Sequence, residues 1–192
     1  MQFLENQGLI ERFQGKGTFV GRPKVASNLM MLFNPVKGIT SVKELPQFVV
    51  RRLRTAQPAA LVAARLGIDS QEKVFDLERS VIVDGEPVML IRSWLTKSRF
   101  PDFESQFAVT GNVLRVLNQY GINSGLQHKE VEITILDETE AEVLDVQPGS
   151  PALLVTYITR TLDGEPFEFR KVIVRGDRCK CYVDQESAEF LV

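Results

Sequence analysis

The amino-acid sequence predicts an α+β fold with one largely antiparallel sheet and flanking helices. Two Asp-Gly pairs, Asp84-Gly85 and Asp163-Gly164, each join two segments of strand character, and this dipeptide in that position is typical of a hairpin turn. Segments whose apolar residues have helical spacing lie between these hairpins. The composition, 44% hydrophobic and 25% charged over 192 residues, is that of one ordinary globular domain, alone or with a remnant of another.

The net charge of −2 hides an uneven distribution. Residues 1–65 contain ten Lys or Arg and three Asp or Glu, a balance of +7, whereas residues 66–192 contain thirteen and twenty-two, a balance of −9. A basic N-terminal part followed by an acidic remainder indicates two functions, one of which is to bind an anionic partner. The apolar runs are far too short to span a membrane, no leader pattern opens the chain, and two cysteines fit a reducing compartment. We therefore expect a cytoplasmic protein without a membrane segment.

The N-terminal part predicts a small hairpin followed by a linker. An apolar pattern predicts the end of a helix that stops at Gly8, because glycine is favoured just past a helix. Two short strands then flank residues 14–17, whose two glycines provide the turn and hold Lys16 at its tip. Residues 21–46 mix Gly, Pro, Ser and Asn with basic residues, which favours a linker with one apolar anchor at 30–33.

The remaining residues predict a domain of strands and short helices. Pro58 in its first turn and Gly67 after its last residue mark one helix. Asp137, with Glu140 three residues later, forms a capping box that opens an acidic helix. Charged and apolar residues alternate at 130–136, as in a half-buried strand. In order, the expected elements are strand 48–54, helix 59–66, strands 73–83 and 86–96, a loop at 99–103, helix 112–120, strand 130–136, helix 137–146, and strands 152–162, 165–175 and 179–183.

Residues 3–20 resemble the end of a winged helix-turn-helix domain of the GntR type. Gly8-Leu9-Ile10, then Arg12, then Gly15-Lys16-Gly17-Thr18-Phe19-Val20 match that family's exit from the recognition helix and its wing. Because a wing lies over phosphates or the adjacent groove, the resemblance implies DNA contacts in the full-length protein; the implied residues are Arg12, Gln14, Lys16 and Thr18. The alternative is a solubilising hairpin. Residues 1–20 match only the last third of such a domain, so we expect a truncated remnant that is poorly ordered and recognises no operator alone.

From about residue 47 onward the sequence resembles the ligand-sensing UTRA domain of the HutC branch, which has a chorismate-lyase-like fold. The matching segments are Leu77-Glu78-Arg79, Asp84-Gly85-Glu86-Pro87, residues 92–95, 144–149 and 164–168, and Arg175-Gly176-Asp177-Arg178. The resemblance implies a sensor at 47–192, joined by a linker at 21–46 to the winged-helix remnant at 1–20. It also implies a homodimer, in which effector binding reorients two DNA-binding domains through the linker.

The resemblance also implies a cleft on the sheet that binds a small anionic or polar metabolite. Arg79 would bind the anionic group and Glu168 hydroxyl or amide groups. The segment that opens a helix would face the ligand with its amides, which suit an anion; its residues are Thr110, Gly111, Asn112 and Val113.

Some positions depart from the family members that sense amino-sugar phosphates. Val81, Ile91 and Val174 stand where those members have an arginine, an acidic residue and an aromatic residue. These replacements point away from a sugar phosphate and toward a small carboxylate or phosphonate, held by Arg79 with help from Arg92. The alternative for both arginines is cross-strand pairing with Glu78, Glu86 or Glu168.

The favoured function is that of a ligand-responsive transcription regulator, a repressor by family likeness. Its partners would be a carboxylate-, phosphonate- or phosphate-bearing effector, DNA and a second copy of the chain. The alternatives are a stand-alone sensor or dimerisation protein without DNA binding, and a lyase on the same fold. No Ser/His/Asp or Cys/His arrangement predicts catalysis, and His128, Cys179 and Cys181 lack further ligands at metal-site spacing. We therefore expect no catalytic residue, cofactor or metal.

Overall fold

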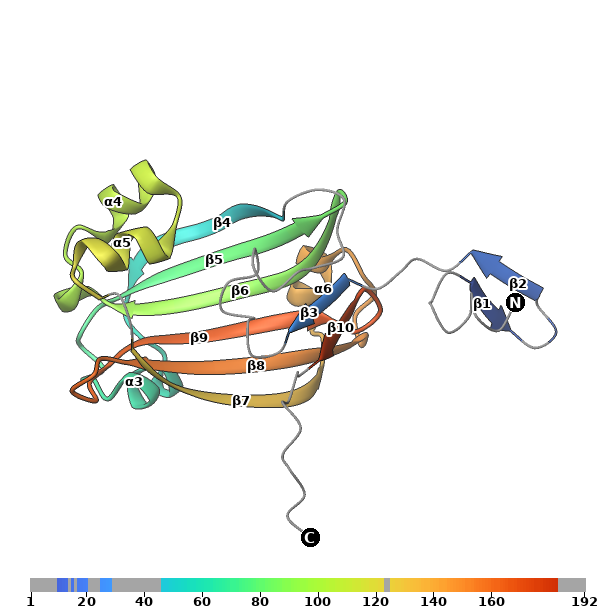
Figure 1. Cartoon of the computed structure of the whole chain (residues 1–192). Coiled ribbons are helices and arrows are strands. Elements are labelled where there is room, and N and C mark those ends of the chain that lie inside the picture. The colour runs from blue at the N-terminus through green and yellow to red at the C-terminus, as the bar shows by residue number, and fades with distance from the viewer. Residues whose placement is uncertain are drawn as a thin grey trace, which may run out of the picture.

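The computed structural model describes residues 10–13, 15, 17–20, 25–28, 46–122 and 125–182. Its main feature is a six-stranded sheet in the order β4-β5-β6-β9-β8-β7, in which every neighbouring pair is antiparallel (Figure 1). This confirms the predicted α+β class with one antiparallel sheet. The strands are β4 (Gln47–Ala56), β5 (Val74–Val83), β6 (Glu86–Thr96), β7 (Leu126–Ile135), β8 (Pro151–Arg160) and β9 (Pro166–Arg175).

Both Asp-Gly hairpins form where they were predicted. Asp84 and Gly85 have φ angles of 50° and 80°, the two positive values that a two-residue hairpin turn requires. The β5–β6 register then shifts, because Val81 lies opposite Met89 while Ile82 lies opposite Pro87. A β-bulge at this point of β6 moves each later β6 side chain to the face opposite the one that a regular hairpin would give it.

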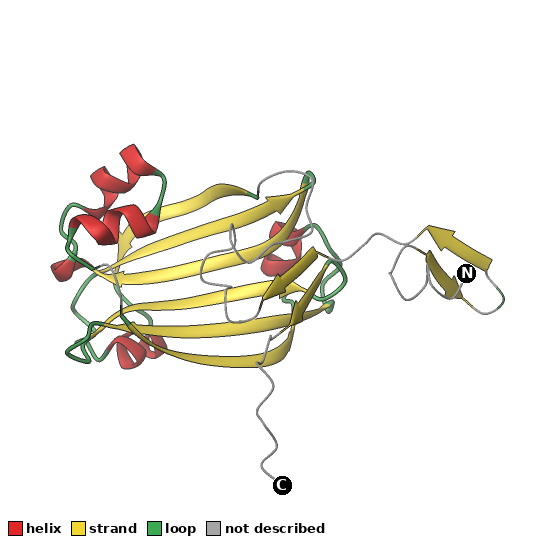
Figure 2. Ribbon diagram, in the orientation of Figure 1, coloured by secondary structure: helices red, strands yellow, loops and turns green. Residues whose placement is uncertain are grey.

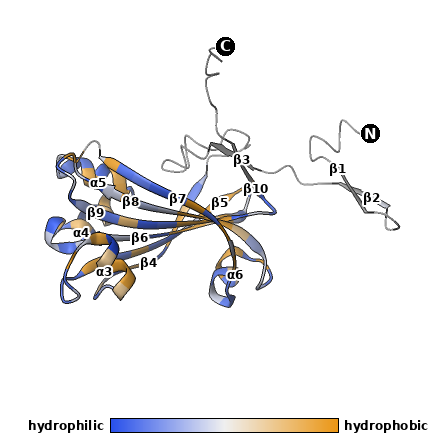
Figure 3. Cartoon of the chain, turned by 90° about the horizontal axis from the view of Figure 1, so that it is seen from below, coloured by the Kyte–Doolittle hydropathy of each residue, from blue (hydrophilic) through white to orange (hydrophobic). Residues whose placement is uncertain are grey.

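Helices cover both faces of the sheet (Figure 2). Helices α3 (Ala60–Leu66) and α6 (Glu138–Leu144) lie on one side (Figure 3), where Leu66 packs with Phe169, and Leu144 packs with Ile173. The opposite face packs against α4 (Phe103–Thr110) and α5 (Val113–Gln119), which follow a short 3-10 turn, η2 (Lys97–Arg99). None of the described helices is long and apolar enough to cross a membrane.

Helix α6 begins as predicted. The Asp137 carboxylate accepts a hydrogen bond from the Glu140 amide at 2.8 Å, and the Glu140 carboxylate accepts one from the Asp137 amide at 3.4 Å. Helix α4 was not predicted. It buries only Phe103 and Phe107, while Val109 is 87% exposed, so its sequence lacks the apolar stripe by which helices are recognised.

Strand β7 differs from its prediction in two ways. It begins at Leu126, four residues before the predicted start. Its apolar side is also not buried, since Val131, Ile133 and Ile135 are 45%, 83% and 67% exposed. The physical reason is position: β7 is the last strand of the sheet, and only β8 pairs with it among the described strands.

The predicted N-terminal hairpin is present as β1 (Ile10–Phe13) and β2 (Gly17–Val20), with Ile10 opposite Val20. The predicted linker contains an unpredicted strand, β3 (Val25–Asn28), which pairs in parallel with the predicted final strand, β10 (Cys179–Tyr182). A four-residue strand whose one described partner lies near the other end of the chain leaves little local sequence signal. The expected helix end at Gly8 and the apolar anchor at 30–33 lie outside the described residues.

Candidate anion-binding site

A row of polar residues crosses one face of the sheet. Residues directly opposite each other in an antiparallel pair point to the same face. The registers place Ser93 opposite Arg170, Arg170 opposite Tyr157, and Tyr157 opposite Lys129. Arg79 and Glu168 lie on the same face in neighbouring rows. We call this set the polar belt; it consists of Arg79, Ser93, Lys129, Tyr157, Thr159, Glu168 and Arg170.

The belt lies between two apolar clusters on the same face. On β5, Leu77 before Arg79 belongs to the cluster under α4 and α5, whereas Val81 after it belongs to the cluster that includes Cys179 of β10. The same change from polar to apolar occurs on β9, where Arg170 is followed by Val172. A small polar ligand would bind at such a band of polar groups between two apolar clusters.

Arg79 is a deeply buried cation of the belt. The residue is 8% exposed, and its Nε has no hydrogen-bond partner among the described residues. Burial, followed by the positive charge of Arg170, lowers the pKa of Arg79 to about 10, although the carboxylate of Glu168 acts in the opposite direction. The guanidinium also lies over the Phe48 ring at 5.7 Å. Arg79 is therefore a desolvated cation that lacks full electrostatic compensation.

Glu168 is the only carboxylate in the belt, and it is 3% exposed. One of its oxygens, Oε2, accepts a hydrogen bond from the Thr159 hydroxyl at 3.3 Å, and the other, Oε1, lies 3.9 Å from Nε of Arg170. The Arg170 guanidinium stacks 4.7 Å from the Tyr157 ring centre, and Nζ of Lys129 lies 5.9 Å from the same ring. Burial and the charge of Arg170 lower the pKa of Lys129. The belt thus combines three cationic groups with one carboxylate, and it suits an anion.

Sequence reasoning missed Ser93, Lys129, Tyr157 and Arg170. Arg170 stands two residues after Glu168 on a strand and must therefore share its face, so the alternation of β9 could have revealed it. Lys129 was missed because the predicted strand began one residue after it.

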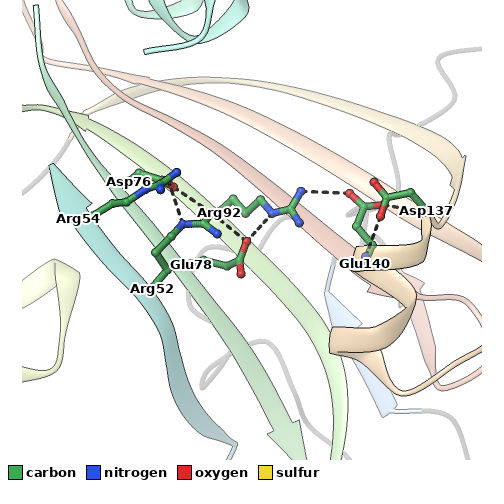
Figure 4. Close-up of polar contacts among 7 residues, drawn as sticks. All are labelled: Arg52, Arg54, Asp76, Glu78, Arg92, Asp137 and Glu140. Atoms are coloured by element: carbon green, nitrogen blue, oxygen red, sulfur yellow. Dashed lines mark hydrogen bonds and ion pairs between the residues drawn. The ribbon is translucent and has the colours of Figure 1, made fainter. Parts of the chain in front are cut away.

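The structure does not bring Arg92 to Arg79. Because of the bulge in β6, Arg92 lies opposite Glu78 and points to the other face. There its Nε donates to Glu78 at 2.7 Å and its NH1 donates to Glu140 of α6 at 3.2 Å (Figure 4). This corrects the expectation that Arg92 assists Arg79: of the two interpretations left open, cross-strand pairing with Glu78 is the one observed.

The α4–α5 junction satisfies its own polar groups. The Thr110 hydroxyl donates to the Gln106 carbonyl at 3.0 Å, and Gly111 ends α4 with a φ of 60°. The Asn112 side chain accepts from the amides of Leu114 and Arg115, so those two amides already have a partner. Val113 is buried in the apolar cluster under α4 and α5. The second and third amides of α5 are therefore already occupied by the Asn112 side chain.

Of the expected wing residues, Arg12 and Thr18 lie opposite each other in the β1–β2 hairpin, and Thr18 is exposed. Gln14 and Lys16 lie outside the described residues. His128 is exposed on β7, with its Nε2 3.3 Å from the Glu130 carboxylate. Within the part of the chain that the structure describes, no three His, Cys, Asp or Glu side chains are grouped so that they could hold a metal ion.

Comparison with known proteins gives a consistent result. A family model described as "UTRA domain" matches residues 44–180. A relative named "Probable fructoselysine utilization operon transcriptional repressor" from Escherichia coli K12 is 25% identical over 185 residues, which cover 95% of this chain and 75% of the relative. The transcriptional repressor NagR of Bacillus subtilis is 26% identical over 178 residues, covering 91% and 72% of the two chains.

Solved structures agree in fold. The crystal structure of PhnF from Mycobacterium smegmatis matches with a TM-score of 0.76 and 23% identity, covering 97% of this chain and 82% of that one. The structure of the possible transcriptional regulator YydK from Bacillus subtilis matches with a TM-score of 0.72 and 21% identity, covering 96% and 79%. The relatives are named as transcription repressors and regulators rather than as enzymes.

Proposed function

The chain belongs to the UTRA domain family, whose relatives here are GntR-type transcription regulators, and we propose that it is the effector-sensing part of such a regulator. The effector we propose is a small metabolite that carries a carboxylate, phosphonate or phosphate group. Its anionic group would lie between Arg79 and Arg170, with Lys129 as a further cation, and Glu168 would accept a hydrogen bond from a hydroxyl or amide of the same ligand.

The observation that carries this proposal is the burial of Arg79, whose Nε has no hydrogen-bond partner among the described residues. Arg79, Arg170 and Glu168 are each less than one-tenth exposed, so all three lie away from bulk water. An anion in the belt would recover the electrostatic energy that burial of Arg79 costs, because charge interactions are strong where water is excluded. A neutral ligand would leave that cost in place.

The regulatory part of the proposal follows from the relatives. Several of them, NagR and PhnF included, are named transcriptional repressors, so we propose a repressor of the HutC branch that acts as a homodimer in the cytoplasm, where the DNA lies. The wing residues proposed to contact DNA in the full-length protein are Arg12, Gln14, Lys16 and Thr18. We retain the division into a winged-helix remnant (1–20), a linker (21–46) and a sensor (47–192) as part of this proposal.

A ligand screen on the 192-residue protein tests the sensor. Dicarboxylates, alkylphosphonates and sugar phosphates would be compared by the rise in melting temperature that each causes, and a ligand at about 100 times its Kd adds roughly 2.7 kcal/mol to the unfolding free energy. For the best compound, Arg79→Met and Arg170→Met should each abolish the rise. Arg92→Met is the control, because Arg92 is bound to Glu78 and Glu140 on the other face. An unchanged rise in Arg79→Met would refute the assignment.

A further inference from the structure

The cationic end of the polar belt borders an aliphatic surface. Lys129, Tyr157 and Arg170 lie opposite one another on β7, β8 and β9, so their side chains point to the same face of the sheet. The next row of side chains on that face consists of three valines: Val131, Val155 and Val172. Val155 and Val172 are buried, whereas Val131 is 45% exposed. A ligand that extends from the cations along β7 and β8 therefore meets aliphatic side chains.

A groove of about 450 Å³ lies in the row after the valines. Its lining is largely apolar and includes Ile133, Leu153, Val174 and Cys179. The charged residue in the lining, Arg175, already donates to Asp177 at 2.7 Å and to the Leu144 carbonyl at 3.1 Å. None of the described lining residues carries a carboxylate. The volume is in the range of small-molecule sites, and the lining suits an apolar group.

We propose that the effector is an amphiphilic anion, with a carboxylate or phosphonate group on an unbranched aliphatic chain of medium length. The anionic group binds Arg170 and Lys129, the chain crosses the valine row, and its end fills the groove. Lys129 and Ile133 are four positions apart on β7, which is roughly 13 Å of strand and the length of about ten extended carbon atoms. This inference rests on the proposed function, since it names the class of effector for the same belt.

The order of polar and apolar rows favours this ligand over one with many hydroxyl groups. Glu168 and Thr159, which suit ligand hydroxyls, lie opposite each other in the row on the other side of the cations. They also share a hydrogen bond of 3.3 Å. A sugar ring over the valines would leave its hydroxyl groups without hydrogen-bond partners, which is costly away from water. Methylene groups in the same place gain free energy by leaving water.

A homologous series of acids tests the inference on the 192-residue protein. Calorimetry would compare butyrate, hexanoate, octanoate and decanoate, and the matching alkylphosphonates, each below the concentration at which it forms micelles. A fully buried methylene tightens binding about fourfold, so a chain that enters the groove should tighten binding at least about thirtyfold from butyrate to decanoate. Beyond about twelve carbons the gain should stop, because the chain then extends past the groove.

Variants locate the two ends of the ligand. Ile133→Asn, at a residue 83% exposed, should cut the gain from butyrate to decanoate at least about threefold and leave butyrate binding unchanged. Val109→Asn, at a residue 87% exposed on α4, is the matched control and should keep the whole gain. Arg170→Met should weaken the binding of every acid in the series. Decanol, which has the chain without the charge, should bind more weakly than decanoate.

The melting temperature of each variant without ligand shows whether it folds. Equal affinities for butyrate and decanoate overturn the inference and leave the proposed function standing. A gain that is unchanged in Ile133→Asn overturns the inference too, as does decanol binding as tight as that of decanoate, because the chain then lies elsewhere or lacks its charged anchor. Failure of the proposed function has a different signature: no anion of any length binds, or binding survives both Arg79→Met and Arg170→Met, and the inference fails with it.

Discussion

Replacement of Arg79 by methionine should make the ligand-free protein more stable. Burial lowers the pKa of this guanidinium to about 10, and the ordinary pKa of arginine is at least about 12.5. At about 1.4 kcal/mol per pKa unit, the charged form of Arg79 lowers the free energy of unfolding by roughly 3 kcal/mol. Methionine has a similar length, fills irregular space and carries no charge.

Some of that energy is offset by contacts that methionine would lose. The cation–π contact of Arg79 with Phe48 is worth about 0.5–1 kcal/mol, whereas the attraction to Glu168 is already included in the lowered pKa. A net gain of about 1–3 kcal/mol remains. For a protein of this size, each kcal/mol raises the melting temperature by about 2–4 °C, so thermal unfolding at pH 7 should shift upward by about 2–12 °C.

The sign of the pH dependence follows from the lowered pKa. Between about pH 10 and the ordinary pKa of arginine, the unfolded chain holds a proton on Arg79 that the folded chain has released, so wild-type stability rises with pH in that window. Below about pH 10 both states are protonated, and the cost is constant. The advantage of Arg79→Met should therefore be the same at pH 6 and pH 9.

The matched control is Arg52→Met, on the other face of the sheet. Burial disfavours the charge of Arg52, but hydrogen bonds and attraction from Asp76 and Glu78 outweigh it and raise the pKa. Its removal leaves those buried carboxylates with fewer partners, and because Arg52 is 35% exposed we expect a loss of about 1 kcal/mol. If Arg79→Met destabilises the protein as Arg52→Met does, then Arg79 is a structural cation and the reasoning is wrong.

Three further predictions follow. Asp137→Ala removes the capping box of α6 and should lower the unfolding free energy by about 1 kcal/mol in urea titration, while the neighbouring Glu138→Ala should change it little. Asp177 accepts from Arg175 at 2.7 Å, and this hydrogen bond lowers its pKa, so Asp177→Asn should cost less than about 1 kcal/mol at pH 6 and progressively nothing as the pH falls below about 4. Glu168→Gln removes the carboxylate of the belt and should tighten inorganic phosphate binding by about threefold or more in calorimetry; weaker binding would mean that Glu168 does not oppose the anion.

The fold could be predicted from the sequence where its signals are local. Asp84-Gly85 sets a hairpin through two positive φ angles, and Asp137 with Glu140 starts a helix through two reciprocal hydrogen bonds. Neither needs distant partners. Helix α4 was not predicted because only two of its residues are buried. Strand β3 was not predicted because its one partner among the described strands is β10, more than 150 residues later.

The error at Arg92 has a similar cause. In a regular hairpin around Asp84-Gly85, Arg92 would lie opposite Leu77 and share a face with Arg79. The bulge in β6 moves it opposite Glu78 instead. One extra residue reverses every later side chain of a strand, and a bulge is set by packing across the sheet rather than by the local sequence. Arg170, rather than Arg92, lies on the same face of the sheet as Arg79 and Glu168.

The two faces of the sheet differ in how their charged side chains are paired. On one face, Arg52, Arg54 and Arg92 meet Asp76, Glu78 and Glu140 in a network of ion pairs between 2.7 and 3.2 Å (Figure 4). Three cations balance three carboxylates there, so the network needs no ligand. On the other face Arg79, directly after Glu78 in the chain, keeps a buried Nε without a hydrogen-bond partner among the described residues. The fold itself gains nothing from a buried guanidinium nitrogen without a partner, whereas the proposed anion sensor would use it.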